Sequence, residues 1–104
     1  MATIREIKGS EFEAAVARGT VLAEFGATWC SSCKMLAAVL AQAAKDAPET
    51  ASIVKLDVDE CQELAKELAI GTLPTLILYK DGQIVKTLTG VQSRAKLVEM
   101  LTNA

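Results

Sequence analysis

The chain has 104 residues, 51% of them hydrophobic and 23% charged, which is enough apolar material for one core and too little for two. Its 11 basic and 13 acidic residues are scattered along the chain and give a net charge of -2, which argues against a nucleic-acid partner. The chain contains no histidine, so Ser–His–Asp and Cys–His catalysis are excluded and the commonest metal ligand is missing. We therefore expect a single domain, residues 1–104.

Three further classes of feature are missing from the sequence. No apolar run approaches the roughly 18 residues that a membrane-spanning helix needs. The first nine residues carry charge and lack the apolar stretch of a signal peptide. No two glycines are spaced as a dinucleotide-binding loop requires. We expect a cytoplasmic protein with no membrane partner and no bound cofactor or metal.

The first half of the chain alternates between segments typical of strands and of helices. Residues 3–7 predict a short strand, and Ser10 with Glu13 predicts a capping box that opens a helix through Arg18, ended by Gly19. Residues 21–25 are an apolar run of strand length, interrupted only by Glu24. From residue 33 the apolar positions recur at helical spacing as far as the Ala47–Pro48 step, which predicts a longer amphipathic helix.

The second half continues this alternation and then changes it. Residues 54–58 alternate apolar and polar, which indicates a strand with one buried face, and residues 60–69 predict a helix with Gly71 as its cap. Residues 75–79 are suited to an interior strand, and Asp81–Gly82 predicts a hairpin turn into residues 83–89. After Gly90, Ser93 caps a last helix. The order βαβαβαββα predicts a mixed sheet covered on both faces.

The chemically distinctive segment is Cys30-Ser31-Ser32-Cys33, where a predicted strand leads into a predicted helix. A thiolate at a helix N-terminus is stabilised by unpaired backbone N–H groups and by the helix dipole. Such placement lowers a thiol pKa from about 8.5 into the range of about 3.5 to 7.5, where attack on a disulfide is fast. The spacing therefore favours thiol–disulfide chemistry.

Two other interpretations of the cysteine pair remain open at this point. A structural disulfide would close a very short loop and contribute only about 2 kcal/mol, and a reducing cytosol would keep it open. A zinc site needs four ligands, and the chain offers one further cysteine, Cys61, and no histidine. Both interpretations are weaker than the redox one.

Over essentially its whole length the sequence resembles the thioredoxin family. The resemblance rests on Phe25–Met35, Lys55–Asp59, Gly71–Leu76, Tyr79–Gly82 and Gly90. A lone C-x-x-C is only suggestive, but the later Leu73-Pro74-Thr75 step makes the match strong. The resemblance implies the thioredoxin fold, a three-layer α/β/α arrangement with a central five-stranded mixed sheet and four flanking helices.

The resemblance also implies an activity. Cys30 would be the nucleophile that attacks a protein disulfide, and Cys33 would resolve the mixed disulfide and leave the pair oxidised. A separate thioredoxin reductase would recycle the protein, which would act as a monomer on disulfide-containing protein substrates. Two alternatives remain: a dedicated thiol carrier or oxidising, isomerase-like member, and a non-catalytic assembly subunit.

Further site residues follow from the same resemblance. Glu24 stands where the family usually has an aspartate that exchanges a proton with the resolving cysteine, and Lys55 matches the lysine partner of that acid; alternatively, both are solvated at strand ends. Pro74 matches a cis-proline, and the residue before it, Leu73, would pair with the substrate backbone. The surrounding contact surface would comprise Trp29, Thr72, Leu73, Gly90 and Val91, although Trp29 could instead be an ordinary packing residue.

Several residues depart from the family pattern. Ser31-Ser32 replaces the usual Gly-Pro between the cysteines, and a hydroxyl that bonds to sulfur would make the couple more oxidising. Gly26 stands where tryptophan is common and removes a large aromatic beneath the site. Cys61 resembles an additional cysteine of animal thioredoxins, and we expect it to be buried or half-buried, with regulatory oxidation or a disulfide-linked dimer as the alternative.

Overall fold

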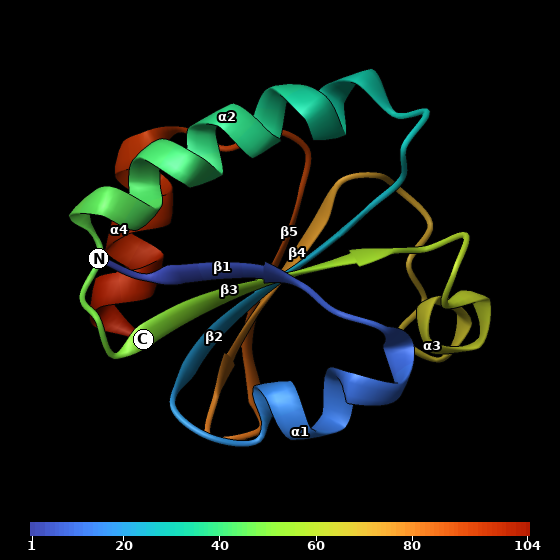
Figure 1. The fold of residues 1–104 in the computed structure, drawn as a ribbon, viewed down its shortest axis with the longest axis horizontal. Helices are drawn as coiled ribbons and strands as arrows, with labels where there is room; N and C mark the ends of the chain where they lie inside the picture. The colour runs from blue at the N-terminus through green and yellow to red at the C-terminus, as the bar shows by residue number, and fades with distance from the viewer.

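The computed structural model describes all residues from 1 to 104 (Figure 1). Its five strands are β1 (Thr3–Glu6), β2 (Thr20–Gly26), β3 (Ala51–Asp57), β4 (Thr75–Lys80) and β5 (Gln83–Thr89). Its four α-helices are α1 (Phe12–Val16), α2 (Ser31–Asp46), α3 (Gln62–Glu67) and α4 (Arg94–Asn103), and a short 3-10 turn, η1 (Gly9–Glu11), precedes α1. The predicted order of elements is confirmed.

The strands form one mixed sheet in the order β1-β3-β2-β4-β5. β3 is parallel to both β1 and β2, whereas β4 runs antiparallel to β2 and to β5. Because β4 is antiparallel to β2, its first residue, Thr75, pairs with Phe25 near the end of β2. The residues just before β4 therefore lie at the same edge of the sheet as the residues just after β2.

Helices cover both faces of the sheet, with α2 and α4 on one side and α1 and α3 on the other (Figure 1). Two separate apolar clusters fill the spaces beneath them, one including Leu22, Leu36 and Leu97, the other including Phe12, Phe25 and Tyr79. β3 contributes Ile53 to the first cluster and Val54 to the second. The expected single buried face of β3 is therefore wrong, because a central strand in a three-layer fold is covered on both sides.

The first helix differs from its predicted form. The backbone N–H of Lys8 donates to Glu11 Oε1 at 2.8 Å, so Lys8 and Glu11 make the capping contact that we expected from Ser10 and Glu13. The chain turns through η1 before α1 begins at Phe12, and α1 ends at Val16 rather than at Arg18. The buried positions explain this start, because Phe12 and Val16 are one helical turn apart and both enter the core.

The cap of α3 also differs from the prediction. Ala69, with φ of 56°, adopts the left-handed conformation at the end of this helix, whereas the predicted cap is Gly71. The N–H of Ile70 donates to the carbonyl of Ala65 at 2.9 Å, which closes the end of the helix. An alanine tolerates this conformation less well than a glycine, so sequence preference points to the wrong residue here.

The C-terminal hairpin and helix agree with the prediction. Asp81 and Gly82 both have positive φ, 51° and 83°, as a two-residue hairpin turn requires. Ser93 is the N-cap of α4, and its side chain accepts a hydrogen bond from the N–H of Lys96 at 3.2 Å. Packing of α4 against α2 closes this side of the molecule.

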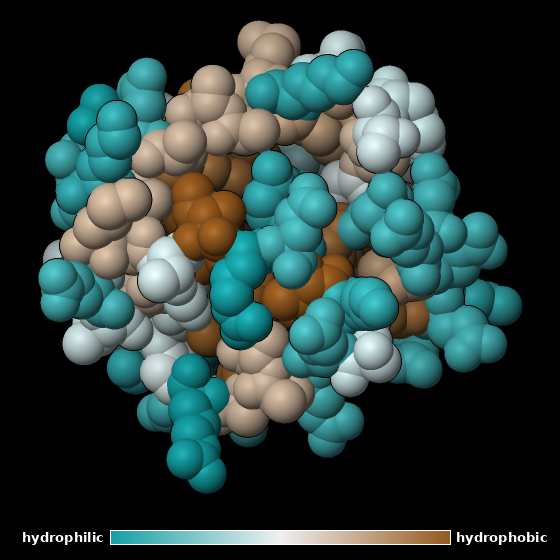
Figure 2. Space-filling view, in the orientation of Figure 1, coloured by the Kyte–Doolittle hydropathy of each residue, from teal (hydrophilic) through white to brown (hydrophobic).

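Figure 2 shows hydrophilic side chains at the edges and across the middle of one face, with apolar atoms visible in the hollows between them. No helix combines the length and the apolar character needed to span a bilayer.

Candidate active site

The two cysteines of the C-x-x-C segment lie at the start of α2. Cys30 is the N-cap residue, with extended backbone, and its Sγ accepts a hydrogen bond from the N–H of Cys33 at 3.2 Å. Both are free thiols, and each side chain is only 7% exposed. The sulfur of Cys30 therefore occupies the place that a capping oxygen takes in other helices, facing unpaired backbone donors.

Ser32 contacts both the nucleophilic sulfur and the loop before β4. Its Oγ lies 3.3 Å from Cys30 Sγ and 3.5 Å from the carbonyl oxygen of Leu73, to which it donates. A hydroxyl has one proton, so it can donate to only one of these acceptors at a time. When Cys30 is a thiolate, its sulfur is the stronger acceptor, so the hydroxyl donates its hydrogen bond to the sulfur.

The environment makes the two thiols unequal. Hydrogen bonding from Cys33, and then from Ser32, lowers the pKa of the Cys30 thiol. Burial, followed by the hydrogen bond to Cys30, raises the pKa of the Cys33 thiol to about 11. Cys30 is therefore the thiol better suited to attack as a thiolate, whereas Cys33 needs a base to remove its proton.

Glu24 lies within β2, beneath the cysteine pair. Its side chain is 3% exposed, so it is not a solvated residue at a strand end. Burial raises the pKa of its carboxyl group to about 7, although Lys55 lowers it and Glu6 adds to the rise. Lys55 faces Glu24 in the parallel register of β2 and β3.

A cavity of about 360 Å³ connects this buried acid with the resolving cysteine. Glu24, Gly26, Cys33 and Lys55 all line it. The cavity lies at the end of β2 and β3, where Gly26 pairs with Asp57. It provides space in which water can reach the carboxyl group.

The loop before β4 lies against the cysteines, as the antiparallel register requires. The Leu73–Pro74 peptide bond is cis, as the resemblance implies, and the carbonyl of Pro74 accepts a hydrogen bond from the N–H of Gly90 at 2.9 Å. Leu73 is half-buried beside Ser32, whereas Thr72 and Val91 are exposed. The structure thus brings residues from three distant segments to one surface.

Trp29 directly precedes Cys30 and is 68% exposed, so it is not an ordinary packing residue. Its indole Nε1 donates to Asp59 Oδ2 at 2.7 Å. Sequence reasoning missed this role of Asp59, although the residue lies within the Lys55–Asp59 segment that carries the resemblance. No local signal identifies the contact, because it joins two loops at the ends of different strands.

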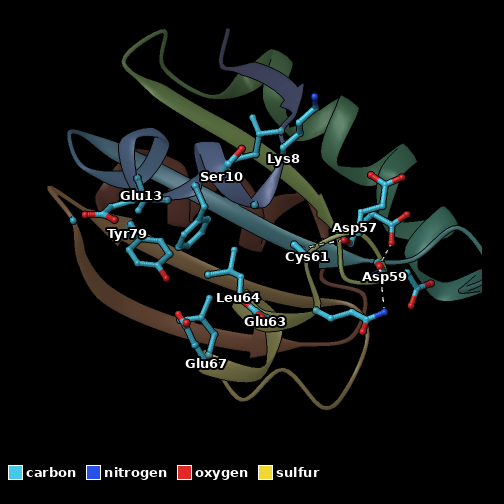
Figure 3. Close-up of a pocket in the computed structure, with 18 residues that line it drawn as sticks. Lys8, Ser10, Glu13, Asp57, Asp59, Cys61, Glu63, Leu64, Glu67 and Tyr79 are labelled. Carbon is cyan, nitrogen blue, oxygen red and sulfur yellow. Dashed lines mark hydrogen bonds between the residues drawn. The ribbon is translucent and has the colours of Figure 1, made fainter.

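A larger cavity lies elsewhere, between η1, α1 and α3, and has a volume of about 1050 Å³ (Figure 3). Neither cysteine of the pair lines it. Cys61 does; it is a half-buried free thiol, as expected, and its S–H donates to the carbonyl of Asp57 at 3.1 Å. Burial, Asp57 and Glu60 raise the pKa of the Cys61 thiol, so it is a poor nucleophile. No group of three or more potential ligands is arranged to hold a metal ion.

Comparisons with known proteins agree with this geometry. The family model "Thioredoxin" matches residues 3–103. A thioredoxin of Staphylococcus aureus is 42% identical over 98 residues, which are 94% of each chain, and one of Listeria monocytogenes is 38% identical over 98 residues, which are 94% of this chain and 95% of the relative.

This chain belongs to the thioredoxin family. Solved structures support the same assignment for the fold. Chloroplastic thioredoxin z superposes with a TM-score of 0.86 at 32% identity, covering 97% of this chain and 93% of that one. A mutant thioredoxin from Halobacterium salinarum superposes with a TM-score of 0.84 at 33% identity, covering 98% of this chain and 93% of that one. As a thioredoxin-family protein with an intact C-x-x-C pair, the chain is a disulfide oxidoreductase in the general sense.

Proposed function

We propose that this thioredoxin reduces disulfide bonds of other proteins through Cys30 and Cys33, and that residues 1–104 act as one domain. The observation that carries the proposal is the unequal pair at the start of α2. The pKa of Cys30 is lowered by hydrogen bonding to its sulfur, whereas that of Cys33 is raised to about 11. A low-pKa nucleophile beside a high-pKa resolving thiol suits a two-step exchange.

In the first step, the Cys30 thiolate attacks one sulfur of a substrate disulfide. A new S–S bond forms between Cys30 and that sulfur, the substrate S–S bond breaks, and the other substrate sulfur leaves as a thiolate with the electron pair. The N–H of Cys33, 3.2 Å from Cys30 Sγ, and the Ser32 hydroxyl, 3.3 Å away, stabilise the attacking charge.

In the second step, Cys33 resolves the mixed disulfide. Its thiol loses a proton to the carboxylate of Glu24, and the resulting thiolate attacks Cys30 Sγ. The Cys30–substrate bond breaks, the substrate leaves as a reduced thiolate, and the chain is left with a Cys30–Cys33 disulfide. Support comes from the pKa of Glu24, about 7, at which the carboxyl group both accepts and releases a proton near neutral pH. Lys55 would keep that pKa from rising further.

The substrate would bind as an extended segment across Trp29, Thr72, Leu73, Gly90 and Val91, with the backbone of Leu73 pairing with it and Pro74 fixing the loop. Backbone pairing supplies affinity without demanding a particular sequence, which suits a reductase with many substrates. The exposure of Trp29 and Val91, 68% and 41%, supports this use of the surface.

We propose that a separate thioredoxin reductase returns the pair to the dithiol state. The chain would work as a monomer. It would act in the cytoplasm, because a dithiol reductant is maintained only where the surroundings are reducing. The electrons would come from that partner, since the cysteine pair is itself consumed in each cycle.

The contact between Ser32 and Cys30 favours a second candidate, an oxidising or isomerase-like member or a dedicated thiol carrier. A hydroxyl that stabilises the thiolate favours the reduced form of the pair, which makes the couple a stronger oxidant. The redox potential and a panel of substrate disulfides separate this candidate from a general reductase.

The first test is insulin reduction with dithiothreitol as electron donor. The wild-type protein should accelerate precipitation of the reduced chains, and Cys30→Ser should abolish the acceleration. Cys61→Ser is the matched control and should retain full activity, because Cys61 is outside the pair. A wild-type protein without effect would refute general reductase activity and favour the carrier or the assembly-subunit alternative.

A further inference from the structure

Gly26 has no side chain at the point where the buried acid and the resolving cysteine approach each other. A Cβ built on Gly26 would lie 2.6 Å from Glu24 Oε2 and 3.1 Å from Cys33 Sγ. Both distances are shorter than ordinary van der Waals contact. The carboxyl oxygen of Glu24 therefore occupies the space that any other residue at position 26 would fill.

The backbone does not explain this glycine. Its φ is not in the left-handed region, in contrast to those of Gly19, Gly82 and Gly90. Gly26 lies at the end of a regular strand and pairs in register with Asp57. What the site requires of position 26 is space and not conformational freedom.

The same two distances limit the separation of the reacting groups. Glu24 Oε2 and Cys33 Sγ both lie close to one point, so they can be no farther apart than the two distances added together. That range allows transfer directly or through one water molecule. Glutamate is one methylene longer than aspartate, so its carboxyl group extends farther along the strand and needs this space.

We propose that Gly26 is a positioning residue for the resolving step, matched to Glu24: the missing side chain lets the longer glutamate place its carboxylate beside Cys33 Sγ. This inference rests on the proposed function and specifies how one of its steps is arranged. It predicts that positions 24 and 26 depend on each other. A methyl group at 26 should be harmful with glutamate at 24 and harmless with aspartate.

The other charged groups around the acid do not take this role. Lys55 on β3 and Glu6 on β1 act on the charge of Glu24, and Lys34, Asp57 and Glu60 line the cavity. Oε2 is the far end of a flexible side chain, so a methyl group at 26 would displace it into the cavity toward Lys55. The carboxylate would then remain in the protein but leave Cys33.

The experiment isolates the resolving step on a small disulfide. Reduced protein, in excess, is mixed with a bis(thionitrobenzoate) disulfide. The Cys30 thiolate forms a mixed disulfide with one half of the reagent and releases the other half as a coloured thiolate, and Cys33 then attacks Cys30 Sγ and releases a second coloured thiolate. Gly26→Ala should slow this second release roughly tenfold at neutral pH, because misplacing a proton acceptor by a small distance is costly. In the Glu24→Asp background the same substitution should slow the second release less than about twofold.

The design separates displacement of the acid from crowding of the thiol. The added methyl group would also lie near Cys33, and that contact persists in the double variant Glu24→Asp/Gly26→Ala. Equal slowing in both backgrounds would mean crowding of Cys33 and would overturn the proposal, as would unchanged release in Gly26→Ala. Gly71→Ala is the matched control, because nothing lies within 4 Å of a Cβ there.

A second readout does not depend on thiol chemistry. The carboxyl band of Glu24 in the infrared spectrum should titrate near pH 7 in the wild type and at lower pH in Gly26→Ala, because the displaced carboxylate is nearer Lys55. An unchanged midpoint would contradict the displacement. If Gly26→Ala does not fold, restored folding in Glu24→Asp/Gly26→Ala would show that positions 24 and 26 depend on each other. If neither variant folds, the proposal is overturned. Neither readout uses a protein substrate. A chain that fails to reduce insulin can therefore still confirm the role of Gly26, so failure of the proposed function and failure of this inference are distinguishable.

Discussion

Trp29 and Asp59 are joined by a hydrogen bond of 2.7 Å between two loops that follow different strands of the sheet. The indole is 68% exposed and would otherwise be free to change rotamer. The backbone of Asp59 is held in turn, because its N–H donates to Asp57 Oδ1 at 2.9 Å. An exposed aromatic ring is thus held in one orientation beside the cysteine pair.

Loss of this bond should weaken substrate binding more than catalysis. Asp59→Ala removes the acceptor and should raise KM for a protein disulfide about fivefold with little change in kcat, since one hydrogen bond contributes about 1 kcal/mol. Asp59→Asn keeps a side-chain oxygen and should behave nearly as the wild type. Trp29 fluorescence anisotropy should fall in the alanine variant only, and equal KM values in all three proteins would contradict the expectation.

Ser32 should set the redox potential. Ser32→Ala removes the hydroxyl 3.3 Å from Cys30 Sγ, destabilises the thiolate and should make the couple more reducing by about 30 mV, the equivalent of 1.4 kcal/mol. Ser32→Pro should shift the potential in the same direction. Equilibration with a glutathione buffer measures both values, and Ser31→Ala is the control, because no contact of its side chain with either sulfur is present. A shift toward a more oxidising couple would refute the role of the hydroxyl.

The three thiols should differ in reactivity. The pKa of Cys30 is lowered, whereas burial raises the pKa of both Cys33 and Cys61, so Cys30 should be the most readily ionised of the three thiols. Iodoacetamide should modify one cysteine of the reduced native protein rapidly, and peptide mass spectrometry should identify it as Cys30. Rapid modification of Cys61 at neutral pH would show that its environment is not the one described.

Glu24 should make stability depend on pH. Its pKa is about 7 in the folded chain and 4.5 as the ordinary value, so the unfolded state ionises first and stability falls as pH rises between these values. Well above pH 7 the free energy of unfolding stays lower by a constant amount, about 3 kcal/mol, than it is below pH 4.5. Glu24→Gln should therefore stabilise the protein at pH 8 and have little effect at pH 4.

Urea denaturation at the two pH values measures this difference. Glu49→Gln provides the control, because Glu49 is exposed and should change stability little at either pH. If Glu24→Gln were destabilising at pH 8, the ionised carboxylate would be held by favourable contacts and not strained by burial. The same variant should slow the resolving step, because an amide cannot accept the proton of Cys33.

The sequence by itself determined the order of the elements, the hairpin at Asp81–Gly82, the cap at Ser93 and the importance of the cysteine pair. These features depend on local rules: side-chain periodicity, turn residues that tolerate positive φ, and a thiol at a helix start. Resemblance added Glu24, Lys55 and Pro74 as candidates. Boundaries and caps were less predictable, as the start of α1 at Phe12 and the left-handed Ala69 demonstrate, because packing against the core overrides local preference.

Only the tertiary structure decided what surrounds the cysteines. The antiparallel pairing of β2 with β4 brings Leu73 to Ser32, the loop after β3 brings Asp59 to Trp29, and burial in the sheet gives Glu24 its raised pKa. The meaning of Gly26 also emerges only in three dimensions, since a missing side chain matters only if another group fills its space. Distances between residues remote in the chain follow from strand pairing and helix packing, which depend on contacts between segments far apart in the sequence.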